Sequence, residues 1–248
     1  MHRFFAPELD AGDESVALPR DEAEHLTRVL RLAAGDLVSV FDGRGHEFTA
    51  RVTSAHRREV RVTILERVQP ALESTVALTL AQAVLKADHM DDVVRDAVML
   101  GVSAIQPLVT RRTETTVAAL MRGARVDRWR RVALASVKQS GRAVLPDVRM
   151  PLTFETFLGE PRAACTLMLV EPRAEAPVGS MSVLRRLTPP ADATILVGPE
   201  GGWTEAEWDA ARERGVRLVT LGARTLRADA VPVAALSVLQ FLWDAPSG

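Results

Sequence analysis

Cysteine is almost absent from this sequence of 248 residues, because Cys165 is the only one. A disulfide framework or a cysteine-based metal site within one chain is therefore excluded, and Cys165 is expected to be a small core residue rather than a nucleophile. The five histidines, at positions 2, 25, 46, 56 and 89, show neither an HExxH pattern nor close spacing with cysteine. No metal site is predicted.

Long apolar segments are also missing. The hydrophobic runs are too short and too often interrupted by charge to span a bilayer, and the first five residues, Met1-His-Arg-Phe-Phe5, have no apolar stretch of the signal-peptide type. With 47% hydrophobic and 25% charged residues, the composition is that of one large or two modest folded domains with a substantial core. A cytoplasmic protein without membrane segments is expected.

Lysine is scarce, since only Lys86 and Lys138 occur among 31 basic residues. The formal net charge of -1 excludes a chain that is basic all over, but nucleic-acid binding depends on where the charges lie. Residues 111–142 contain nine Lys or Arg residues and only two acids, Glu114 and Asp127, so this segment is strongly positive. Both a phosphate-binding surface and a plain solvated helix face are consistent with it.

The first 70 residues differ in pattern from the others. Residues 23–32 have the spacing of a short amphipathic helix, and residues 37–41, 47–52 and 60–65 alternate between apolar and polar side chains, as strands do. Asp42-Gly-Arg-Gly45 has the composition of a hairpin turn. A small β-barrel domain is therefore predicted for residues 1–70.

Residues 70–73 are the expected linker, because helices alternate with strands after them. The predicted strands are residues 75–85, 102–109, 166–170, 195–197 and 217–221. The predicted helices are residues 88–100, 126–140, a short one near 182–187, one that begins at Thr204, and 229–243. This alternation predicts a mostly parallel α/β sheet with helices on both faces over residues 74–248.

Two glycine loops follow the last two predicted strands. The first, Gly198-Pro-Glu-Gly-Gly202, leads into a helix that Thr204 and Glu207 begin as a capping box. The second begins at Gly222 and continues as Arg224-Thr-Leu-Arg227. Glycine lets backbone N–H groups approach a ligand closely at the carboxyl edge of a sheet. Neither loop has the GxGxxG or GxxxxGK[ST] pattern, which disfavours a dinucleotide or a nucleoside triphosphate.

Taken together, three motifs resemble the C-terminal signature of the SPOUT methyltransferases, and among them the RsmE-type rRNA uracil-N3 methyltransferases. These motifs are Leu196-Val-Gly-Pro-Glu-Gly-Gly202, Leu221-Gly-Ala-Arg-Thr-Leu-Arg227 and Ala234-Ala-Leu236. The segments His25-Leu-Thr-Arg-Val-Leu-Arg31 and Phe41-Asp-Gly43 resemble the PUA-like N-terminal domain of the same family. Further matches at Ala81-Gln-Ala-Val-Leu-Lys86 and Gln139-Ser-Gly-Arg142 extend the resemblance over nearly the whole chain.

The resemblance implies a fold, a cofactor and partners. The expected fold is a SPOUT-type α/β domain with a deep C-terminal trefoil knot, preceded by a PUA-like β-barrel. The expected cofactor is S-adenosyl-L-methionine, the expected substrate is 16S rRNA or the small ribosomal subunit, and a homodimer is expected. The final helix supports the dimer, because it has more apolar side chains than one helix face buries within its own domain: Val233, Leu236, Val238, Leu239, Phe241, Leu242 and Trp243.

The candidate site residues are assigned by their positions in the sequence. Methyl transfer to uracil N3 removes a proton from a ring nitrogen, so positive charge or N–H donors are expected to stabilise the developing anion. The candidates for catalysis are Arg227, Arg224, Glu200 and Asp229, although salt bridges that only fix the loop are equally consistent with the two arginines. The expected cofactor-binding residues are Leu169, Glu171, Val197, Gly198, Glu200, Gly201, Gly202, Leu221, Gly222, Leu226 and Arg227. The expected RNA-binding residues are Arg28, Arg31, Arg111, Arg112, Arg128, Arg131 and Arg142.

The sequence departs from the family pattern at two places. The family commonly has a Lys and a Glu where this chain has Arg95-Asp-Ala-Val-Met99, and tends to have Thr-Glu-Thr-Ala where this chain has Ala228-Asp-Ala-Val231. Asp229 keeps the carboxylate on a shorter side chain. Two other function classes remain open. One is a SPOUT enzyme acting on tRNA or on a ribose 2'-hydroxyl, and the other is a non-catalytic rRNA-binding protein of the same fold.

Overall fold

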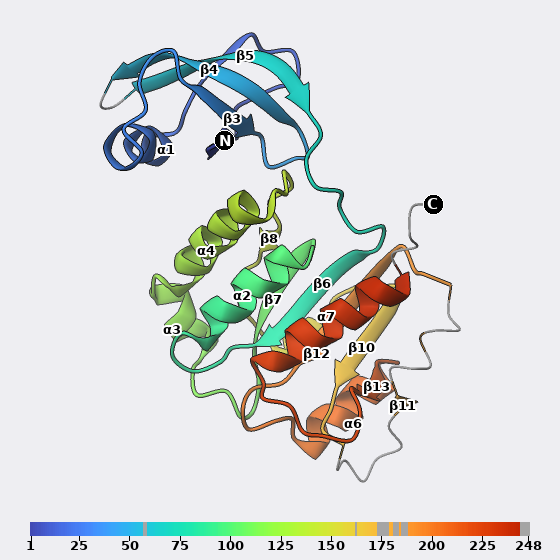
Figure 1. The fold of residues 1–248 in the computed structure, drawn as a ribbon. Helices are drawn as coiled ribbons and strands as arrows, with labels where there is room; N and C mark the ends of the chain where they lie inside the picture. Colours follow the sequence, from blue (N-terminus) through green and yellow to red (C-terminus); the bar gives the residue numbers. More distant parts are fainter. Residues whose placement is uncertain (57–58, 162, 173–178, 181–183, 185–187, 244–248) are drawn as a thin grey trace. The chain divides into compact units, whose positions relative to one another are not determined.

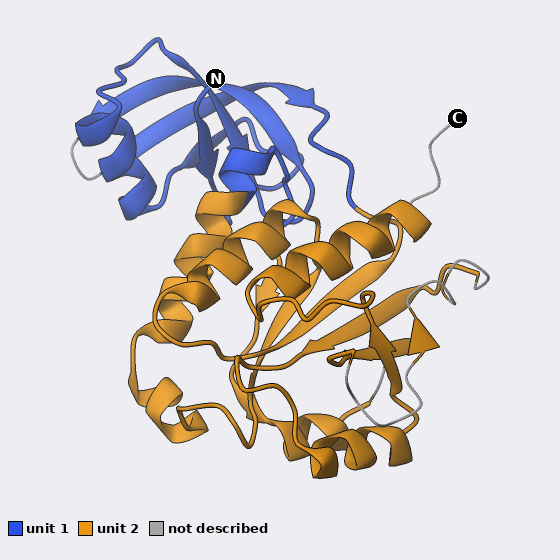
Figure 2. Cartoon of the chain, turned by 60° about the horizontal axis from the view of Figure 1, so that its bottom comes forward, with its two compact units in different colours: residues 1–73, 137–145 blue, residues 74–136, 146–248 orange. Residues whose placement is uncertain are grey.

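The computed structural model describes residues 1–56, 59–161, 163–172, 179–180, 184 and 188–243. The chain divides into two compact units (Figure 2). Unit 1 consists of residues 1–73 and 137–145, and unit 2 of residues 74–136 and 146–248. Each unit is built on a sheet of its own.

Unit 1 contains a five-stranded sheet in the order β1-β3-β4-β5-β2. Its strands are β1 (Arg3–Phe5), β2 (Ser15–Ala17), β3 (Leu37–Phe41), β4 (Glu47–His56) and β5 (Glu59–Val68). β1 runs parallel to β3, and the other pairs are antiparallel. The predicted strands and the hairpin turn at Asp42 are confirmed. β4 extends beyond its predicted end because its backbone ladder with β5 continues to the pair His56 and Glu59. β5 extends to Val68, which pairs with Glu47 at the start of β4.

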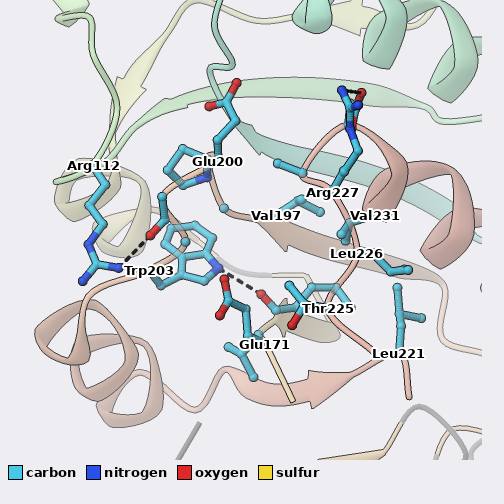
Figure 3. A pocket seen from close by; sticks show the side chains of 18 of the residues that line it. Arg112, Glu171, Val197, Glu200, Trp203, Leu221, Thr225, Leu226, Arg227 and Val231 are labelled. Carbon is cyan, nitrogen blue, oxygen red and sulfur yellow. Dashed lines mark hydrogen bonds and ion pairs between the residues drawn. The ribbon is translucent and has the colours of Figure 1, made fainter. Parts of the chain in front are cut away.

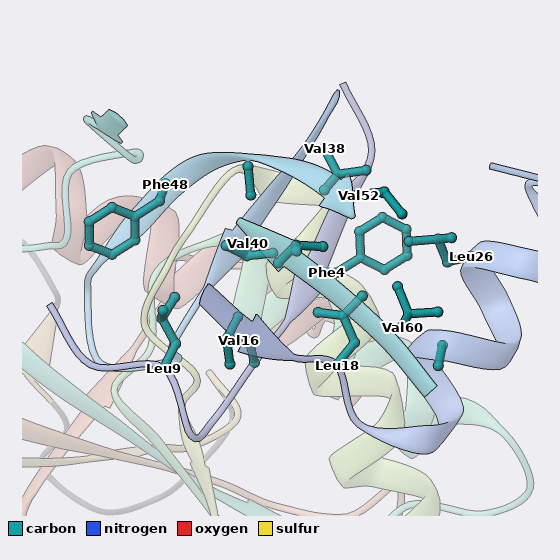
Figure 4. Packing of buried hydrophobic residues seen from close by; sticks show 14 residues of the cluster. Phe4, Leu9, Val16, Leu18, Leu26, Val38, Val40, Phe48, Val52 and Val60 are labelled. Carbon is teal, nitrogen blue, oxygen red and sulfur yellow. The ribbon is translucent and has the colours of Figure 1, made fainter. Parts of the chain in front are cut away.

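The core of unit 1 lies between this sheet and a short helical segment (Figure 4). Phe4, Leu26, Val40, Val52 and Val60 are among its fully buried side chains. The helical segment consists of α1 (Arg20–Glu24) and a π-helical turn, η1 (His25–Val29). It ends earlier than predicted because Arg31 has a φ of 56°, which a helix cannot accommodate.

The last turn of α4 (Arg125–Ser140) belongs to unit 1. Arg3 donates hydrogen bonds to the carbonyl oxygens of Val137 at 2.8 Å and Lys138 at 2.9 Å, and it also pairs with Glu47 at 2.7 Å. These carbonyls are at the C-terminal end of the helix, where they have no partner within the helix itself. Arg3 therefore caps α4 with a cation, and Glu47 holds that cation in place.

Unit 2 contains an eight-stranded sheet in the order β11-β13-β10-β12-β6-β7-β8, with β9 also paired to β7. The strands are β6 (Ala77–Ala83), β7 (Ala104–Val109), β8 (Asp147–Val148), β9 (Leu152–Thr153), β10 (Cys165–Leu169), β11 (Gly179–Ser180), β12 (Asp192–Val197) and β13 (Arg217–Thr220). Every strand pair of this sheet within the described residues is parallel. The predicted mostly parallel α/β sheet is confirmed.

Helices cover both faces of this sheet. Besides α4 they are α2 (His89–Met99), α3 (Val117–Arg122), α5 (Phe154–Gly159), α6 (Glu205–Glu213) and α7 (Ala230–Trp243). Figures 1 and 2 show α2, α4 and α7 on one face and α6 on the other. The central strands are mostly apolar and buried, as in β10, where all five residues are buried. This arrangement leaves the carboxyl ends of the strands to form the site.

Several elements were not predicted because they are short. α3 and α5 have six residues each and are N-capped by Thr116 and Thr153, whose hydroxyl oxygens accept hydrogen bonds from the backbone of the first turn. Such segments are too short to establish a helical period in the sequence. The helix predicted near residues 182–187 lies outside the described residues, apart from Leu184. The trefoil knot stays a prediction.

Candidate active site

A pocket of about 800 Å³ lies at the carboxyl ends of four adjacent strands, β13, β10, β12 and β6 (Figure 3). Parallel α/β sheets bind ligands at this edge. The segments that follow the strands supply its walls. The apolar wall residues include Leu85, Leu169, Val170, Val197, Leu221, Leu226 and Val231, and the polar or charged ones include His89, Arg112, Glu171, Glu200, Arg224, Arg227 and Asp229.

The glycine loop after β12 is held by Trp203. Its indole Nε1 donates a hydrogen bond of 2.9 Å to the carbonyl oxygen of Leu169, and its ring packs against Phe154 with 5.2 Å between the ring centroids. A Cβ added to Gly198 would lie 3.0 Å from Nε1 of the same indole. The absence of a side chain at Gly198 therefore lets a buried tryptophan fix the loop to the end of β10.

The other two glycines make room for side chains from elsewhere in unit 2. Gly202 has a φ of 68°, and a Cβ on it would lie 3.1 Å from Oε1 of Glu171. A Cβ on Gly201 would lie 3.3 Å from the side chain of Arg112, which donates a 2.6 Å hydrogen bond to the Gly201 carbonyl oxygen. The loop thus brings Glu171 and Arg112 against its own backbone, with Glu171 inside the pocket.

The predicted capping box of α6 is confirmed and has a further role. Thr204 accepts a hydrogen bond from the N–H of Glu207, and the Glu207 carboxylate accepts from the N–H of Thr204 at 2.8 Å. The other carboxylate oxygen of Glu207, which is 3% exposed as a residue, accepts from the N–H of Arg111 at 2.9 Å. A single buried carboxylate therefore fixes the loop after β7 to the start of α6.

Glu200 lines the pocket and contacts the loop after β6. Its Oε1 accepts a hydrogen bond of 3.0 Å from the N–H of Lys86. The ammonium group of Lys86 pairs with Glu114 at 2.6 Å, and this hydrogen bond raises the pKa of Lys86 above its ordinary value. Glu200 is thus held by a backbone donor.

Arg227 and Asp229 form a two-point ion pair at the other side of the pocket, marked by the dashed contact at Arg227 in Figure 3. Arg227 Nε donates to Oδ1 at 3.1 Å and Nη2 donates to Oδ2 at 3.0 Å. Burial raises the pKa of Asp229, but the hydrogen bonds and charge of Arg227, with smaller contributions from its own backbone and His89, lower that pKa by more. Asp229 is therefore ionised, and His89 Nδ1 lies 3.6 Å from its Oδ2.

The structure brings together the residues predicted for chemistry. Arg224, Arg227, Glu200 and Asp229 all line the pocket. So do all the predicted cofactor-binding residues except Gly222, which has a φ of 115° and whose carbonyl oxygen accepts a 3.1 Å hydrogen bond from the Thr220 hydroxyl in the turn after β13. Sequence reasoning missed His89, Trp203, Trp208 and Thr225. Trp203 directly follows the glycine motif, a signal that could have identified it.

The residues predicted to bind RNA are dispersed, and four of the seven are paired with acids. Arg112 lines the pocket and Arg31 is exposed. Arg131 is exposed and bonds the backbone of Asp127. The paired ones are Arg28 with Glu24, Arg111 with Glu155, Arg128 with Asp88 and Asp91, and Arg142 with Glu73. Arg142 is only 3% exposed, so its guanidinium is inside unit 1 and does not face a phosphate from solution.

Two findings concern membranes and metals. No helix within the described residues is both long and apolar enough to cross a bilayer. In the same part of the chain, no three residues among His, Cys, Asp and Glu are grouped so that they could hold a metal ion.

Comparison with known proteins agrees with this geometry. Residues 72–240 match the family model described as an RNA methyltransferase domain, and residues 18–65 match the RNA methyltransferase PUA domain. The fold and the site together define an RNA methyltransferase with a PUA-like domain.

Individual relatives narrow the class of RNA methyltransferase to one family. The ribosomal RNA small subunit methyltransferase E of Synechocystis is 33% identical over 235 residues, covering 94% of this chain and 75% of the relative. The protein of the same name from Rickettsia conorii is 28% identical, covering 97% of this chain and 96% of the relative. The crystal structure of the Neisseria gonorrhoeae enzyme bound to S-adenosyl methionine has a TM-score of 0.86 and 32% identity, covering 98% of both chains. The chain belongs to the ribosomal RNA small subunit methyltransferase E family, and the predicted family and enzyme class are confirmed.

Proposed function

We propose that this chain transfers the methyl group of S-adenosyl-L-methionine to N3 of a specific uridine in 16S rRNA. One observation carries the proposal. A glycine-loop pocket at the carboxyl ends of four strands lies beside a fixed arginine, Arg227, that can meet the negative charge formed on the base. The names of the relatives, which are small-subunit rRNA methyltransferases, supply the substrate class.

The pocket residues fit S-adenosylmethionine, which is the methyl donor of this enzyme. Val197, Leu221, Leu226 and Val231 give an apolar surface suited to an adenine ring. The carboxylate of Glu171 lies inside the pocket and suits the cationic part of the molecule. When bound, the cofactor supplies a methyl group made electrophilic by its sulfonium sulfur.

The chain's own residues position the base and stabilise its charge. Methyl transfer to a ring nitrogen is an in-line displacement, in which orientation of the two reactants is worth as much as about 7–11 kcal/mol. Arg227 is held by two hydrogen bonds to Asp229, so its guanidinium needs no reorganisation when charge develops on the uracil. None of the described residues pairs with Arg224, and its guanidinium at the pocket is available to the RNA.

RNA binding is assigned to both units. Residues 1–70 form the PUA-like RNA-binding domain, in which Arg28 and Arg31 contact phosphates, and residues 74–248 form the methyltransferase domain. In the second domain the RNA-binding residues are Arg111, Arg112, Arg128 and Arg131, all of which are exposed. Guanidinium groups are suited to phosphate oxygens because they donate paired hydrogen bonds.

Three further properties belong to the same proposal. The C-terminal loops form the trefoil knot, and the enzyme works in the cytoplasm. The enzyme is a homodimer that pairs through α7, on which Phe241 is 82% exposed and Val238 is 36% exposed. Leu236, Leu239 and Trp243 of that helix are buried within unit 2, so the exposed side chains are the ones left for a second copy.

Mass spectrometry of 16S rRNA from a strain lacking the gene tests the function. The expected result is the loss of one N3-methyluridine, restored by the wild-type gene and not by the Arg227→Ala variant. A digest that keeps this nucleotide and instead loses a ribose methylation or a tRNA methylation would contradict the proposal.

A further inference from the structure

We infer that His89 is a further catalytic residue, which accepts the proton of the uracil N3 during methyl transfer. The inference rests on the proposed function. His89 is the first residue of α2, three residues beyond Lys86 in the loop after β6, and its side chain lines the pocket. Its imidazole is 43% exposed, so a substrate base can reach it.

His89 is the one imidazole among the described residues that line this pocket, and no lysine, tyrosine or cysteine is present among them. Histidine is the side chain whose ordinary titration range is closest to neutral pH, whereas free carboxylates titrate about two units lower. A proton acceptor works best when its basicity matches the working pH. The residue type whose ordinary basicity best matches neutral pH is therefore present at one position of the pocket.

The other groups of the pocket that could take the proton are its carboxylates, and the two among the candidates for catalysis are engaged elsewhere. Asp229 accepts two hydrogen bonds from Arg227, which contribute to holding its pKa below the ordinary value. Glu200 accepts a hydrogen bond from the backbone of Lys86. Glu171 lies across the pocket from Arg227, against the glycine loop, as Figure 3 shows. Glu205, the remaining carboxylate of the pocket lining, is exposed on the first turn of α6. Asp229 and Glu200 are thus held by other donors, and His89 is the side chain that we assign to the proton.

Asp229 connects His89 to Arg227. One carboxylate oxygen, Oδ2, lies 3.0 Å from Nη2 of Arg227 and 3.6 Å from Nδ1 of His89. A carboxylate beside Nδ1 favours the tautomer that carries its proton there, which leaves Nε2 as the basic nitrogen. The separation of 3.6 Å is within ion-pair range, and catalytic hydrogen bonds are often long in the absence of substrate. No described residue bonds Nε2.

The charged groups on the helix of His89 and opposite it at Asp229 are paired with one another. On its own helix, Asp88 and Asp91 are bound by Arg128, and Asp92 is bound by Arg95. Across from it, Asp229 and Arg227 form their two-point ion pair. The carboxylate within 4 Å of the imidazole is therefore that of Asp229.

The step balances without another reactant. The uracil N3 gives its proton to Nε2 of His89 and forms its bond to the methyl carbon, while the bond between that carbon and the sulfonium sulfur breaks. The sulfonium becomes a neutral thioether, the uracil becomes neutral N3-methyluracil, and the positive charge remains on the imidazolium. Arg227 stabilises the negative charge that develops on the base as the proton leaves.

The test is a single-turnover methyl-transfer assay with His89→Ala at saturating S-adenosylmethionine and saturating small-subunit rRNA, over a range of pH. The rate at neutral pH is expected to fall about 100-fold or more. Added imidazole should restore part of it, and so should a pH high enough to ionise the uracil N3–H directly. Asp92→Ala, on the same helix, is the control and should keep the wild-type rate.

Binding and spectroscopy separate catalysis from structure. The affinities of His89→Ala for S-adenosylmethionine and for RNA should equal those of the wild type, as measured by calorimetry and filter binding. In nitrogen NMR spectra of the cofactor-free protein, His89 should carry its proton on Nδ1, and Asp229→Asn should weaken this preference.

Two results would overturn the inference. One is a wild-type rate for His89→Ala at every pH, and the other is a loss of rate that neither imidazole nor alkaline pH relieves. If the wild-type protein itself methylates no uracil N3, the proposed function fails. The wild-type reaction therefore tests the proposed function, and the His89→Ala reaction tests the role of His89.

Discussion

The indole of Trp203 donates a 2.9 Å hydrogen bond to the carbonyl oxygen of Leu169, and this bond fixes the glycine loop after β12 to the end of β10. The two strands are neighbours in the sheet, and their carboxyl ends form one wall of the pocket. The shape of the pocket thus depends on a buried aromatic side chain and on the glycines that let it and its neighbours approach the backbone.

Replacing Gly202 by valine is expected to abolish measurable binding of S-adenosylmethionine while the protein stays folded. Its φ of 68° is strained for a β-branched residue by about 1–3 kcal/mol, and the new side chain would displace the Glu171 carboxylate from the pocket. Isothermal calorimetry measures the affinity. The control is Gly159→Ala, where no atom lies within 4 Å of an added Cβ. Wild-type affinity in Gly202→Val would remove this loop from the site.

Replacing Arg227 by alanine is expected to lower kcat about 100-fold or more and to leave the RNA affinity nearly unchanged. A residue that stabilises charge formed on the base acts mainly in the transition state, so its loss appears in turnover rather than in binding. Steady-state kinetics together with a filter-binding assay measure both quantities. A variant that keeps the wild-type kcat would reduce Arg227 to a structural partner of Asp229.

Replacing Arg131 by glutamine is expected to weaken RNA binding and to lower the slope of log K against log[salt] by about one unit, the effect of one lost phosphate contact. Arg95→Gln is the matched control, because Arg95 is engaged by both Asp92 and Asp96 and offers little free charge. The affinity for S-adenosylmethionine should be the same in both variants. Equal salt slopes in Arg131→Gln and the wild type would place the RNA elsewhere.

Replacing Phe241 by glutamate is expected to convert the dimer into a monomer, because a charge would be buried in the proposed contact of α7. Light scattering at micromolar concentration measures the mass. Leu72→Glu is the control, since Leu72 is 78% exposed and lies in the other unit. A monomeric wild-type protein, or a dimeric Phe241→Glu variant, would contradict pairing through this helix.

Replacing Asp42 by asparagine is expected to destabilise the protein by about 1–3 kcal/mol at neutral pH, through the loss of its charge-assisted hydrogen bonds. Burial raises the pKa of Asp42, but hydrogen bonds from the His46 ring and from the backbone of Arg44 and His46 lower it by more, below the ordinary 3.8. The stabilisation is therefore complete above that value and is lost as the pH falls through the lower folded-state pKa. Urea denaturation of both proteins against pH measures this. A stability difference that does not shrink in acid would contradict the assignment.

Local sequence patterns determined the fold class, the place of the site and the family resemblance of this protein. The alternation of helices and strands, the capping box at Thr204 and the two glycine loops are local patterns, and each can be read from residues close together in the chain. They were sufficient to predict the parallel sheet, the carboxyl edge as the place of the site, and four candidate residues that all line the pocket. The motifs, read together, also indicated the family.

The tertiary structure decided what those residues are bound to. Trp203 with Leu169, Glu207 with Arg111 and His89 with Asp229 join positions far apart in the sequence, so no local period could reveal them. The basic residues also show what local patterns cannot reveal. Arg142 and Arg131 both lie in the basic segment, yet Arg142 is buried against Glu73 and Arg131 is exposed. The spacing of residues along the chain determines which side chains share a helix or strand. The packing of distant elements against one another determines the partners, the burial and the unpaired charges of those side chains, and the chemistry depends on these.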